Sequence, residues 1–428
     1  MRKLELNRKV KIRSFNPNDK NHFFGYYGKS PWDKSGRYFV CLESDFFNRF
    51  QNKNDIANIL LVDLEKNKTE KIAETKAWNW QQGCMLQWLG SDFNSKIIFN
   101  DRAGDKFVSR IIDIKTKKEK IIPHTVYDVH PSGKYAISLS FSRLNMVRKG
   151  YGYEGVENKN KKKIIPENEG VYLVDFETGR KKLIISLGEL AMYKPLDSMK
   201  KGNHWIDQPI FNPKGDRFCF LHRWEIGNGL FHTRFFTADI NGKNLFMFPD
   251  SGFYSHFTWK NNKDILVWCS VSEKFGKIRK GNKKSNFILE KILPIYRKLI
   301  PRYIRKKILP ANYYLITDQS SDIKKIKINY EDGHPSFTKD ERYLITDTYP
   351  DAKHFRKLIL YDFLKNKKIN LGKFYTLPKG IKDSNWDNGG LRCDLHPRWN
   401  FQGNKICFDS VHEGKRGVYV IDLKKIIS

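Results

Sequence analysis

The sequence predicts an all-β fold, a seven-bladed β-propeller with a basic helical insertion in its fifth blade. Three observations lead to this prediction. A unit made of two strand-rich halves recurs seven times, polar glycine-containing turns interrupt the units, and a strand-like segment near the start of the chain can supply what the last unit lacks. Because one small antiparallel sheet cannot bury both of its faces, such units are expected to pack side by side around an axis.

Each unit opens with a short aromatic or His-Pro strand, passes through a polar Gly, Asp or Lys turn and continues in a β-rich run. The seven openings span residues 30–44, 85–101, 127–141, 208–224, 254–270, 334–350 and 395–410. Their second halves span residues 58–72, 109–122, 170–185, 234–248, 313–326, 357–371 and 417–427. Turns such as Lys-Ser-Gly and Glu-Thr-Gly suit the positive φ of tight hairpins. We therefore predict one propeller domain over residues 1–428; a pair of two-sheet sandwiches would not account for seven like units.

The ends of the chain and the spacing of the units complete the predicted ring. The last unit stops without an outer strand, and we expect residues 9–15, "KVKIRSF", to supply it and close the ring. The units are unevenly spaced, which marks insertions at residues 143–170, 188–207 and, in the fifth unit, 272–310.

The fifth-unit insertion is strongly basic over residues 274–310. Isoleucine, leucine and tyrosine recur there near helical spacing, and Pro294 and Pro301 would divide the segment into two short helices. A basic amphipathic segment of this kind can lie on an anionic membrane surface, which is the interpretation we favour. The alternative is a helical flap packed on a neighbouring blade. No nucleic acid partner is expected, because the segment has no recognised reading motif.

The amino-acid composition restricts the possible binding partners and the expected cellular compartment of the protein. The 428 residues carry a formal net charge of +32, which favours an anionic partner such as acidic lipid or acidic polysaccharide, although a lysine-rich surface alone would also give this value. The six cysteines are scattered through apolar runs, so we expect buried free thiols and a reducing compartment. No long apolar run follows the basic N-terminus. We therefore expect a cytoplasmic protein, peripheral at the inner membrane.

Polar residues that can carry chemistry gather at the openings of the units. Of the eleven histidines, five stand there, and together with three other polar residues they are His130, His204, Gln208, His256, His334, Cys393, Asp394 and His396. Corresponding openings meet at one axial face of a propeller, so we expect several of these side chains to converge. The alternative is that each His-Pro caps a turn.

Two of these histidines form the centre of a predicted metal site. His334 and His396 are the expected pair, completed by either Cys393 or Asp394. Imidazole with a carboxylate suits Mn²⁺ or Zn²⁺, and a thiolate would favour Zn²⁺. Alternation along the strand sends Asp394 and His396 to one side and Cys393 to the other, so both Cys393 and Asp394 would bind only if a bulge intervened.

The stretches "YSHFTW", "HPSFTKDERYLITD" and "LHPRWNFQGNKICFDS" resemble the blade openings of propeller-type polysaccharide lyases, the oligogalacturonate lyases and the ulvan lyases. The resemblance implies a seven-bladed propeller that cleaves uronic-acid polymers by β-elimination with a bound divalent metal. It places His334 in the His-Pro-Ser motif of the oligogalacturonate lyases and His396 at the end of their Gln-x-x-His-x-His motif. Here Asp394 stands where that motif has a histidine, and Leu391 replaces the glutamine. Cys393 with His396 is closer to the structural zinc site of the ulvan lyases.

The resemblance also implies catalytic roles. It suggests His256 as the base and Arg234 as the residue that faces the substrate carboxylate, or, on the ulvan-lyase pattern, His204 and Arg223 with a tyrosine that the sequence does not assign. These residue types suit the chemistry, because proton removal beside a uronate carboxylate builds negative charge on it.

Two functions are therefore expected from the sequence. The first is an enzyme acting on an acidic polysaccharide or oligosaccharide, a lyase or an epimerase, linked to bacterial envelope or capsular polysaccharide. The alternative is a non-catalytic propeller that binds a glycan or a protein at the inner membrane during polysaccharide biosynthesis.

Overall fold

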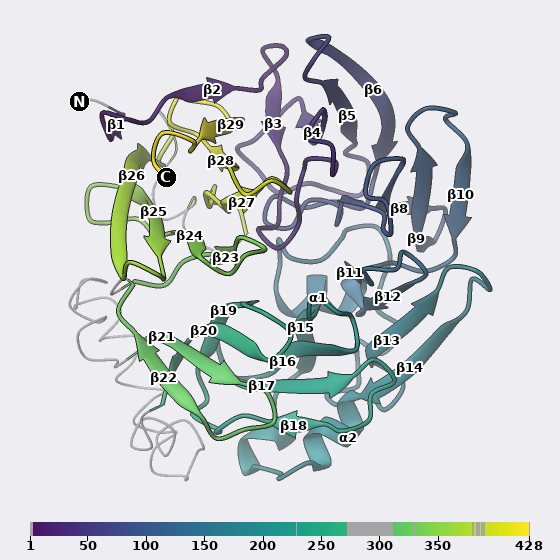
Figure 1. The fold of residues 1–428 in the computed structure, drawn as a ribbon. Coiled ribbons are helices and arrows are strands. Elements are labelled where there is room, and N and C mark those ends of the chain that lie inside the picture. The colour runs from purple at the N-terminus through teal and green to yellow at the C-terminus, as the bar shows by residue number, and fades with distance from the viewer. Residues whose placement is uncertain are drawn as a thin grey trace.

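The computed structural model describes residues 3–227, 229–271, 311–328, 331–378, 381, 386 and 390–427. Its strands form seven antiparallel sheets around a common centre, as Figure 1 shows. The prediction of a seven-bladed β-propeller is confirmed.

The first six blades each contain four strands that follow one another in sequence from the axis outwards. The seventh blade contains three such strands, and the N-terminal segment adds one strand to the sixth blade and one to the seventh. The first three blades comprise β3 (Asn21–Phe23), β4 (Tyr38–Ser44), β5 (Ala57–Asp63) and β6 (Lys68–Thr75); β7 (Gln87–Trp88), β8 (Lys96–Ala103), β9 (Lys106–Asp113) and β10 (Glu119–Ile122); and β11 (Asp128–Val129), β12 (Tyr135–Ser138), β13 (Gly170–Asp175) and β14 (Lys181–Ser186). The next two comprise β15 (His204–Phe211), β16 (Arg217–Gly227), β17 (Leu230–Asp239) and β18 (Phe246–Met247); and β19 (Tyr254–Trp259), β20 (Asp264–Ser270), β21 (Ala311–Thr317) and β22 (Ile323–Ile326). The last two comprise β23 (Ser336–Phe337), β24 (Tyr343–Asp347), β25 (Phe355–Asp362) and β26 (Lys367–Tyr375); and β27 (Arg398–Trp399), β28 (Lys405–Ser410) and β29 (Gly417–Asp422).

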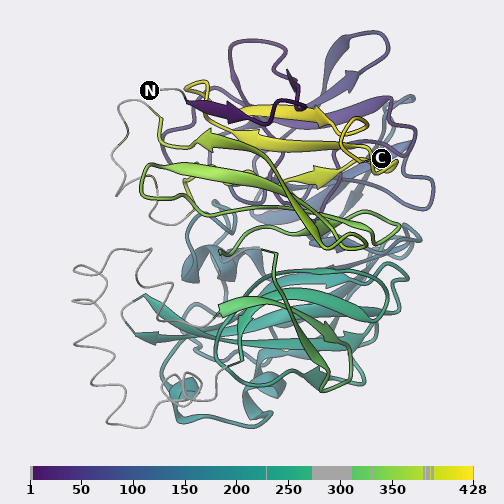
Figure 2. The ribbon, with the colours of Figure 1, turned by 60° about the vertical axis from the view of Figure 1, so that its left-hand side comes forward.

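The N-terminus closes the ring. β2 (Ile12–Ser14) pairs antiparallel with β29, with Ile12 opposite Ile421, and supplies the missing outer strand of the seventh blade. The predicted latch is confirmed. The sequence analysis did not predict β1 (Leu4–Leu6), which adds a fifth strand to the sixth blade by pairing with β26. Figure 2 shows these purple strands lying beside the green and yellow strands of the last two blades.

The core lies between the blades and follows from strand alternation. In β16, Phe218 and Phe220 pack into one apolar cluster, whereas Cys219 and Leu221 face the cluster on the other side of the sheet. Each sheet thus buries both faces against its neighbours, which holds the inner strands at fixed positions around the axis. All six cysteines are buried and unpaired, as predicted.

Short helices occupy two of the predicted insertions. α1 (Phe141–Val147) follows β12, and α2 (Leu187–Met192) and the 3-10 helix η1 (Asp197–Lys200) follow β14. A capping box between Ser186 and Glu189 begins α2. The predicted basic insertion at residues 274–310 lies outside the described residues. In the part of the chain that the structure describes, no helix combines the length and the apolar character that a membrane span requires.

Candidate active site at the axis of the ring

Three histidines from successive blades meet near the axis. His256 lies on β19, while His334 and His396 each stand two residues before the innermost strand of their blade, β23 and β27. The ring centres of His256 and His334 are 4.1 Å apart, and those of His334 and His396 are 4.2 Å apart. The convergence expected from the repeat therefore occurs for these three residues.

Hydrogen bonds fix the orientation of His334 and His396. The Nδ1–H of His334 donates to Asp347 Oδ1 at 2.8 Å, and the Nδ1–H of His396 donates to the carbonyl oxygen of Gly25 at 2.7 Å. These bonds leave the Nε2 lone pair of each ring available to a ligand. Burial lowers the pKa of both histidines well below the usual value, so both are neutral near pH 7.

The carboxylate of Asp347 organises both histidine segments. Besides the ring of His334, it accepts the backbone N–H of His334 at 2.8 Å and those of Leu395 and His396 at 3.1 and 3.3 Å. The sequence analysis missed Asp347. The available signal was a carboxylate ending the apolar run "YLIT", at the position where β24 reaches the axis.

Gly25 completes this support because no other residue fits its place. Its φ is +110°, and a Cβ built there would lie 2.5 Å from the backbone nitrogen of Gly83. This close approach of the first two blades brings the carbonyl oxygen of Gly25 to His396.

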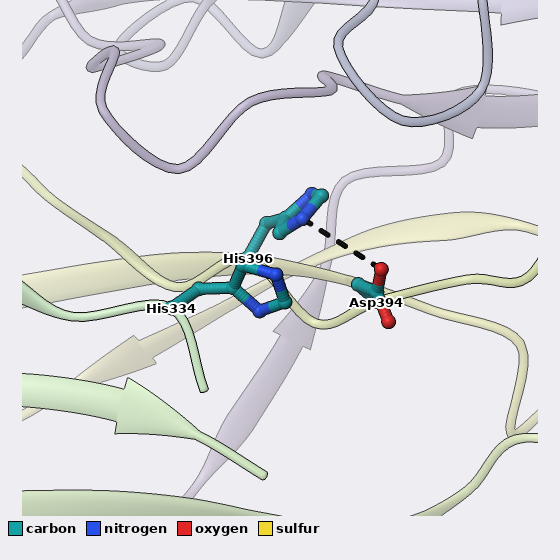
Figure 3. Close-up of side chains that lie close together, drawn as sticks. All are labelled: His334, Asp394 and His396. Carbon is teal, nitrogen blue, oxygen red and sulfur yellow. Dashed lines mark ion pairs between the residues drawn. The ribbon is translucent and has the colours of Figure 1, made fainter. Parts of the chain in front are cut away.

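Asp394 lies beside the two histidines, as Figure 3 shows. Ligand atoms of His334, Asp394 and His396 lie within 4.8 Å of one another, and Asp394 Oδ2 is 3.9 Å from His396 Nε2. Although burial alone would raise the pKa of Asp394, Arg356 at 2.5 Å and Arg392 at 3.0 Å hold it well below the usual range. The carboxylate is therefore ionised at neutral pH.

The donor set fits a divalent cation. Asp394 Oδ2 is buried and accepts no hydrogen bond of regular geometry among the described residues, although Arg392 Nε lies 3.0 Å from it, and this is uncommon for a buried carboxylate oxygen. Two neutral imidazole nitrogens and one ionised carboxylate oxygen suit Mn²⁺ or Zn²⁺. The three side chains of Figure 3 could therefore hold such an ion.

Cys393 points away from this group. Its side chain packs in the apolar cluster between the first two blades and the last segment of the chain, and its Sγ contacts the carbonyl oxygen of Asp394. Burial raises the pKa of the thiol to about 12. The structure thus brings Asp394, and not Cys393, beside His334 and His396.

A second carboxylate orients His256. Asp332 Oδ1 accepts the Nδ1–H of His256 at 3.0 Å, and its Oδ2 accepts from the Ser255 hydroxyl at 2.6 Å. The His256 Nε2 therefore carries the lone pair and can accept a proton. The side chains of His256 and Asp332 are 9% and 16% exposed, so this edge is the least buried part of the histidine group. The sequence analysis did not single out Asp332.

Arg223 lies in a polar cluster of the fourth blade. It forms an ion pair with Asp207, which also accepts from Arg148 at 2.6 Å. Arg148 stacks over the ring of Tyr151 at 3.5 Å, and the Tyr151 hydroxyl accepts from Arg392 at 3.1 Å. Since Arg392 also binds Asp394, this cluster adjoins the histidine group.

Arg234 and His204 occupy different surroundings. Arg234 is on β17, the third strand of its blade, and donates to Asp250 and to the carbonyl oxygens of Tyr193 and Lys194. Its side chain is only 1% exposed. These contacts give Arg234 a structural role. Among the described residues, it makes no contact with His256, His334 or His396.

The His204 ring is also fully engaged. One of its ring nitrogens lies 2.9 Å from the carbonyl oxygen of Met199 and the other 2.9 Å from His222 Nε2. Burial lowers its pKa to about 4. His130 likewise stays apart, because its Nδ1 bonds the Ser132 hydroxyl at 2.7 Å within its own turn.

Comparisons with known proteins define the class of fold. No family model and no curated protein matches the chain. Among solved structures, an oligogalacturonate lyase from Vibrio parahaemolyticus aligns over 99% of this chain and 98% of its own, with a TM-score of 0.62 and 14% identity. An oligogalacturonate lyase in complex with manganese aligns over 98% and 95%, with a TM-score of 0.61 and 13% identity. The tricorn protease gives 0.50 and 11% over 95% of this chain and 34% of its own.

The chain therefore has the seven-bladed propeller fold and is similar over its whole length to the oligogalacturonate lyases. At these identities the similarity concerns the fold. What the site does must be argued from its own residues.

Proposed function

We propose that this protein acts on an acidic, uronate-containing glycan and cleaves it by β-elimination. The observation that carries the proposal is the axial group of His256, His334, His396 and Asp394, bordered by arginines that adjoin Asp394. Such a reaction needs a base, a positive group beside the sugar carboxylate and a site that is open on one side. The whole-length fold similarity to oligogalacturonate lyases supports the same substrate class.

His256 is the proposed base. Asp332 holds its Nδ1 proton, so the Nε2 lone pair can take the proton next to the carboxylate of the sugar. The Asp332 carboxylate lies 3.0 Å from the ring and keeps the imidazole in this orientation while the proton is transferred. The electron pair of that C–H bond forms the double bond of an unsaturated uronate as the neighbouring glycosidic C–O bond breaks. The departing oxygen keeps the electrons of the broken bond and takes a proton from the His256 imidazolium or from water, which leaves a hydroxyl group on the released sugar.

His334, His396 and Asp394 would hold a divalent cation, Mn²⁺ or Zn²⁺. Bound there, the cation would act as a Lewis acid that neutralises the charge developing on the sugar carboxylate. Asp347 and the Gly25 carbonyl keep the two imidazoles in the orientation that this binding requires.

Incubation with a panel of acidic polysaccharides tests the proposal, followed by the ultraviolet absorbance of the unsaturated uronate. We expect product from at least one uronate polymer and a loss of at least about 100-fold in rate for His256→Ala, as for removal of a general base. His130→Ala is the control, since His130 also stands at the opening of a blade but bonds Ser132 outside the axial group. Full activity of His256→Ala, or no product from any uronate polymer, would refute the proposal.

An epimerase would use the same proton abstraction without cleavage. Incorporation of deuterium from solvent into a chain of unchanged length would identify that reaction.

A non-catalytic glycan-binding propeller is the second candidate. It is favoured by the two arginines that already neutralise Asp394 and so weaken its attraction for a cation. Binding of uronate oligomers with no product, unaffected by His256→Ala, would support this alternative. A place in capsular or envelope polysaccharide assembly at the inner membrane remains part of the proposal.

A further inference from the structure

At the edge of the active-site group, the carboxylate of Asp207 forms ion pairs with two arginines. Asp207 Oδ2 accepts from Arg148 Nη1 at 2.6 Å and from Arg223 Nη1. Two guanidinium groups thus face one carboxylate, and the pair keeps one positive charge that Asp207 does not neutralise. The Arg148 side chain is 23% exposed, whereas those of Arg223 and Asp207 are 5% and 0% exposed. The surplus charge is therefore partly withdrawn from water and still accessible through Arg148.

Tyr151 connects this arginine pair to the proposed reaction centre. The guanidinium of Arg148 lies 3.5 Å from the centre of the Tyr151 ring, and the Tyr151 hydroxyl accepts from Arg392 Nη2 at 3.1 Å. Arg392 in turn contacts Asp394 at 3.0 Å. A group bound at Arg148 would consequently lie next to the histidine and carboxylate group, but outside it.

Asp207, its ion-pair partner Arg223 and its chain neighbour Gln208 each have a buried polar atom without a hydrogen-bond partner among the described residues. Arg223 Nε, Asp207 Oδ1 and Gln208 Oε1 are buried and make no hydrogen bond among the residues that the structure describes. Gln208 also adopts a φ of +54°, a costly conformation for a residue other than glycine. Native proteins rarely leave such atoms unpaired unless water or a ligand completes the site. Of the three, Arg223 Nε is a donor that an acidic group can satisfy, whereas Asp207 Oδ1 and Gln208 Oε1 accept and need donors such as sugar hydroxyl groups or water. An acidic sugar carries both kinds of group, and the surplus positive charge favours its carboxylate or sulfate.

We propose that Arg148, Arg223 and Tyr151 form a second subsite, which binds the acidic group of the sugar next to the reacting one. This inference rests on the proposed function and specifies it, because the substrate must then carry acidic groups on two neighbouring sugars. The N–H groups of a guanidinium can form paired hydrogen bonds with two oxygens of either a uronate carboxylate or a sulfate ester. Arg148 caps the end of α1, so an insertion places it and the blade repeat does not.

Calorimetric binding in a His256→Ala background, which prevents turnover, tests this subsite. The ligands are galacturonate, trigalacturonate, its methyl-esterified neutral form and a chondroitin sulfate tetrasaccharide. We expect trigalacturonate to bind more tightly than the monomer and the neutral trimer. Arg148→Gln should weaken trimer binding at least about tenfold and leave the monomer unchanged, since one charged hydrogen-bonding group is lost. Tighter binding of the sulfated ligand, lost in the same variant, would assign the group as a sulfate.

Lys149→Gln is the matched control, because it removes the same charge from the neighbouring exposed residue. Arg148→Lys keeps the charge and should restore part of the trimer affinity, which separates recognition from a folding defect. Unchanged trimer binding by Arg148→Gln, or an equal loss for monomer and trimer, would overturn the second subsite while leaving the proposed function intact. If none of the acidic ligands binds the unsubstituted site, the proposed function itself fails and the subsite fails with it.

Discussion

Replacing Asp347 with asparagine should disturb the active-site group more than any change of similar size on the surface. The carboxylate accepts four hydrogen bonds, from the backbone and ring of His334 and from the backbone of Leu395 and His396, at 2.8 to 3.3 Å. Asparagine keeps one accepting oxygen, and its NH₂ group would face N–H donors. At least two hydrogen bonds are lost, each contributing about 1.5–3 kcal/mol when the acceptor is charged.

We therefore expect Asp347→Asn to lower the free energy of unfolding by at least about 3 kcal/mol, a large share of the usual 5–15 kcal/mol. Affinity for Mn²⁺ or Zn²⁺ should fall about 10- to 100-fold, because Asp347 supports the ring of His334 and the backbone of His396. Urea denaturation and metal titration measure the two effects. Asp113→Asn is the control, since Asp113 accepts two backbone N–H groups in the exposed turn between the two outer strands of the second blade, β9 and β10. Equal denaturation midpoints and metal affinities for the two variants would refute the reasoning.

Three further predictions concern pH, metal content and membranes. Burial lowers the pKa of His204 and of His412 to about 4, so the folded protein binds fewer protons than the unfolded chain between that value and about 6.5. The free energy of unfolding should reach its full value above pH 6.5 and fall by up to about 3 kcal/mol per histidine as the pH falls to 4. A urea denaturation midpoint that does not change over this pH range would contradict the prediction. Elemental analysis should find a divalent metal in the purified protein and much less in a His334→Ala, His396→Ala double variant, and equal content in both would count against the metal site. Co-sedimentation with vesicles should depend on anionic lipid, weaken with salt and disappear when residues 274–310 are deleted, whereas unchanged binding by the deletion would exclude the basic insertion.

The sequence predicted the blades because their determinants are local. Alternating apolar residues and glycine turns recur within each unit, and the repeat itself places equivalent openings at one axis. This symmetry brought His256, His334 and His396 together as predicted. Cys393 and Asp394 point apart as predicted, but the reason given was wrong, because both residues precede β27 and lie outside any strand.

The supporting contacts could not be predicted in the same way because they join distant segments. Gly25 and His396 are 371 positions apart, and the sequence around either residue contains no pattern that predicts the hydrogen bond between them. Arg148 and Tyr151 belong to an insertion that has no counterpart in other blades, so the repeat gives no rule for placing them. For Arg234, the sequence predicted the strand-rich segment that begins at residue 234, but its side-chain contacts became evident only from the structure.

The pairing of β1 and β2 with the last two blades has a consequence for biosynthesis. Ile12 meets Ile421, so β2 is made long before its partner strand and must wait until β29 has been synthesised. Contacts of such long sequence separation slow folding, and strands with unpaired edges are prone to associate with other chains in the meantime. Translation that stops before β29 would release a ring that cannot close, with β2 exposed. Until β29 has been made, the ring therefore stays open, and the edge of β2 is exposed to association with other chains.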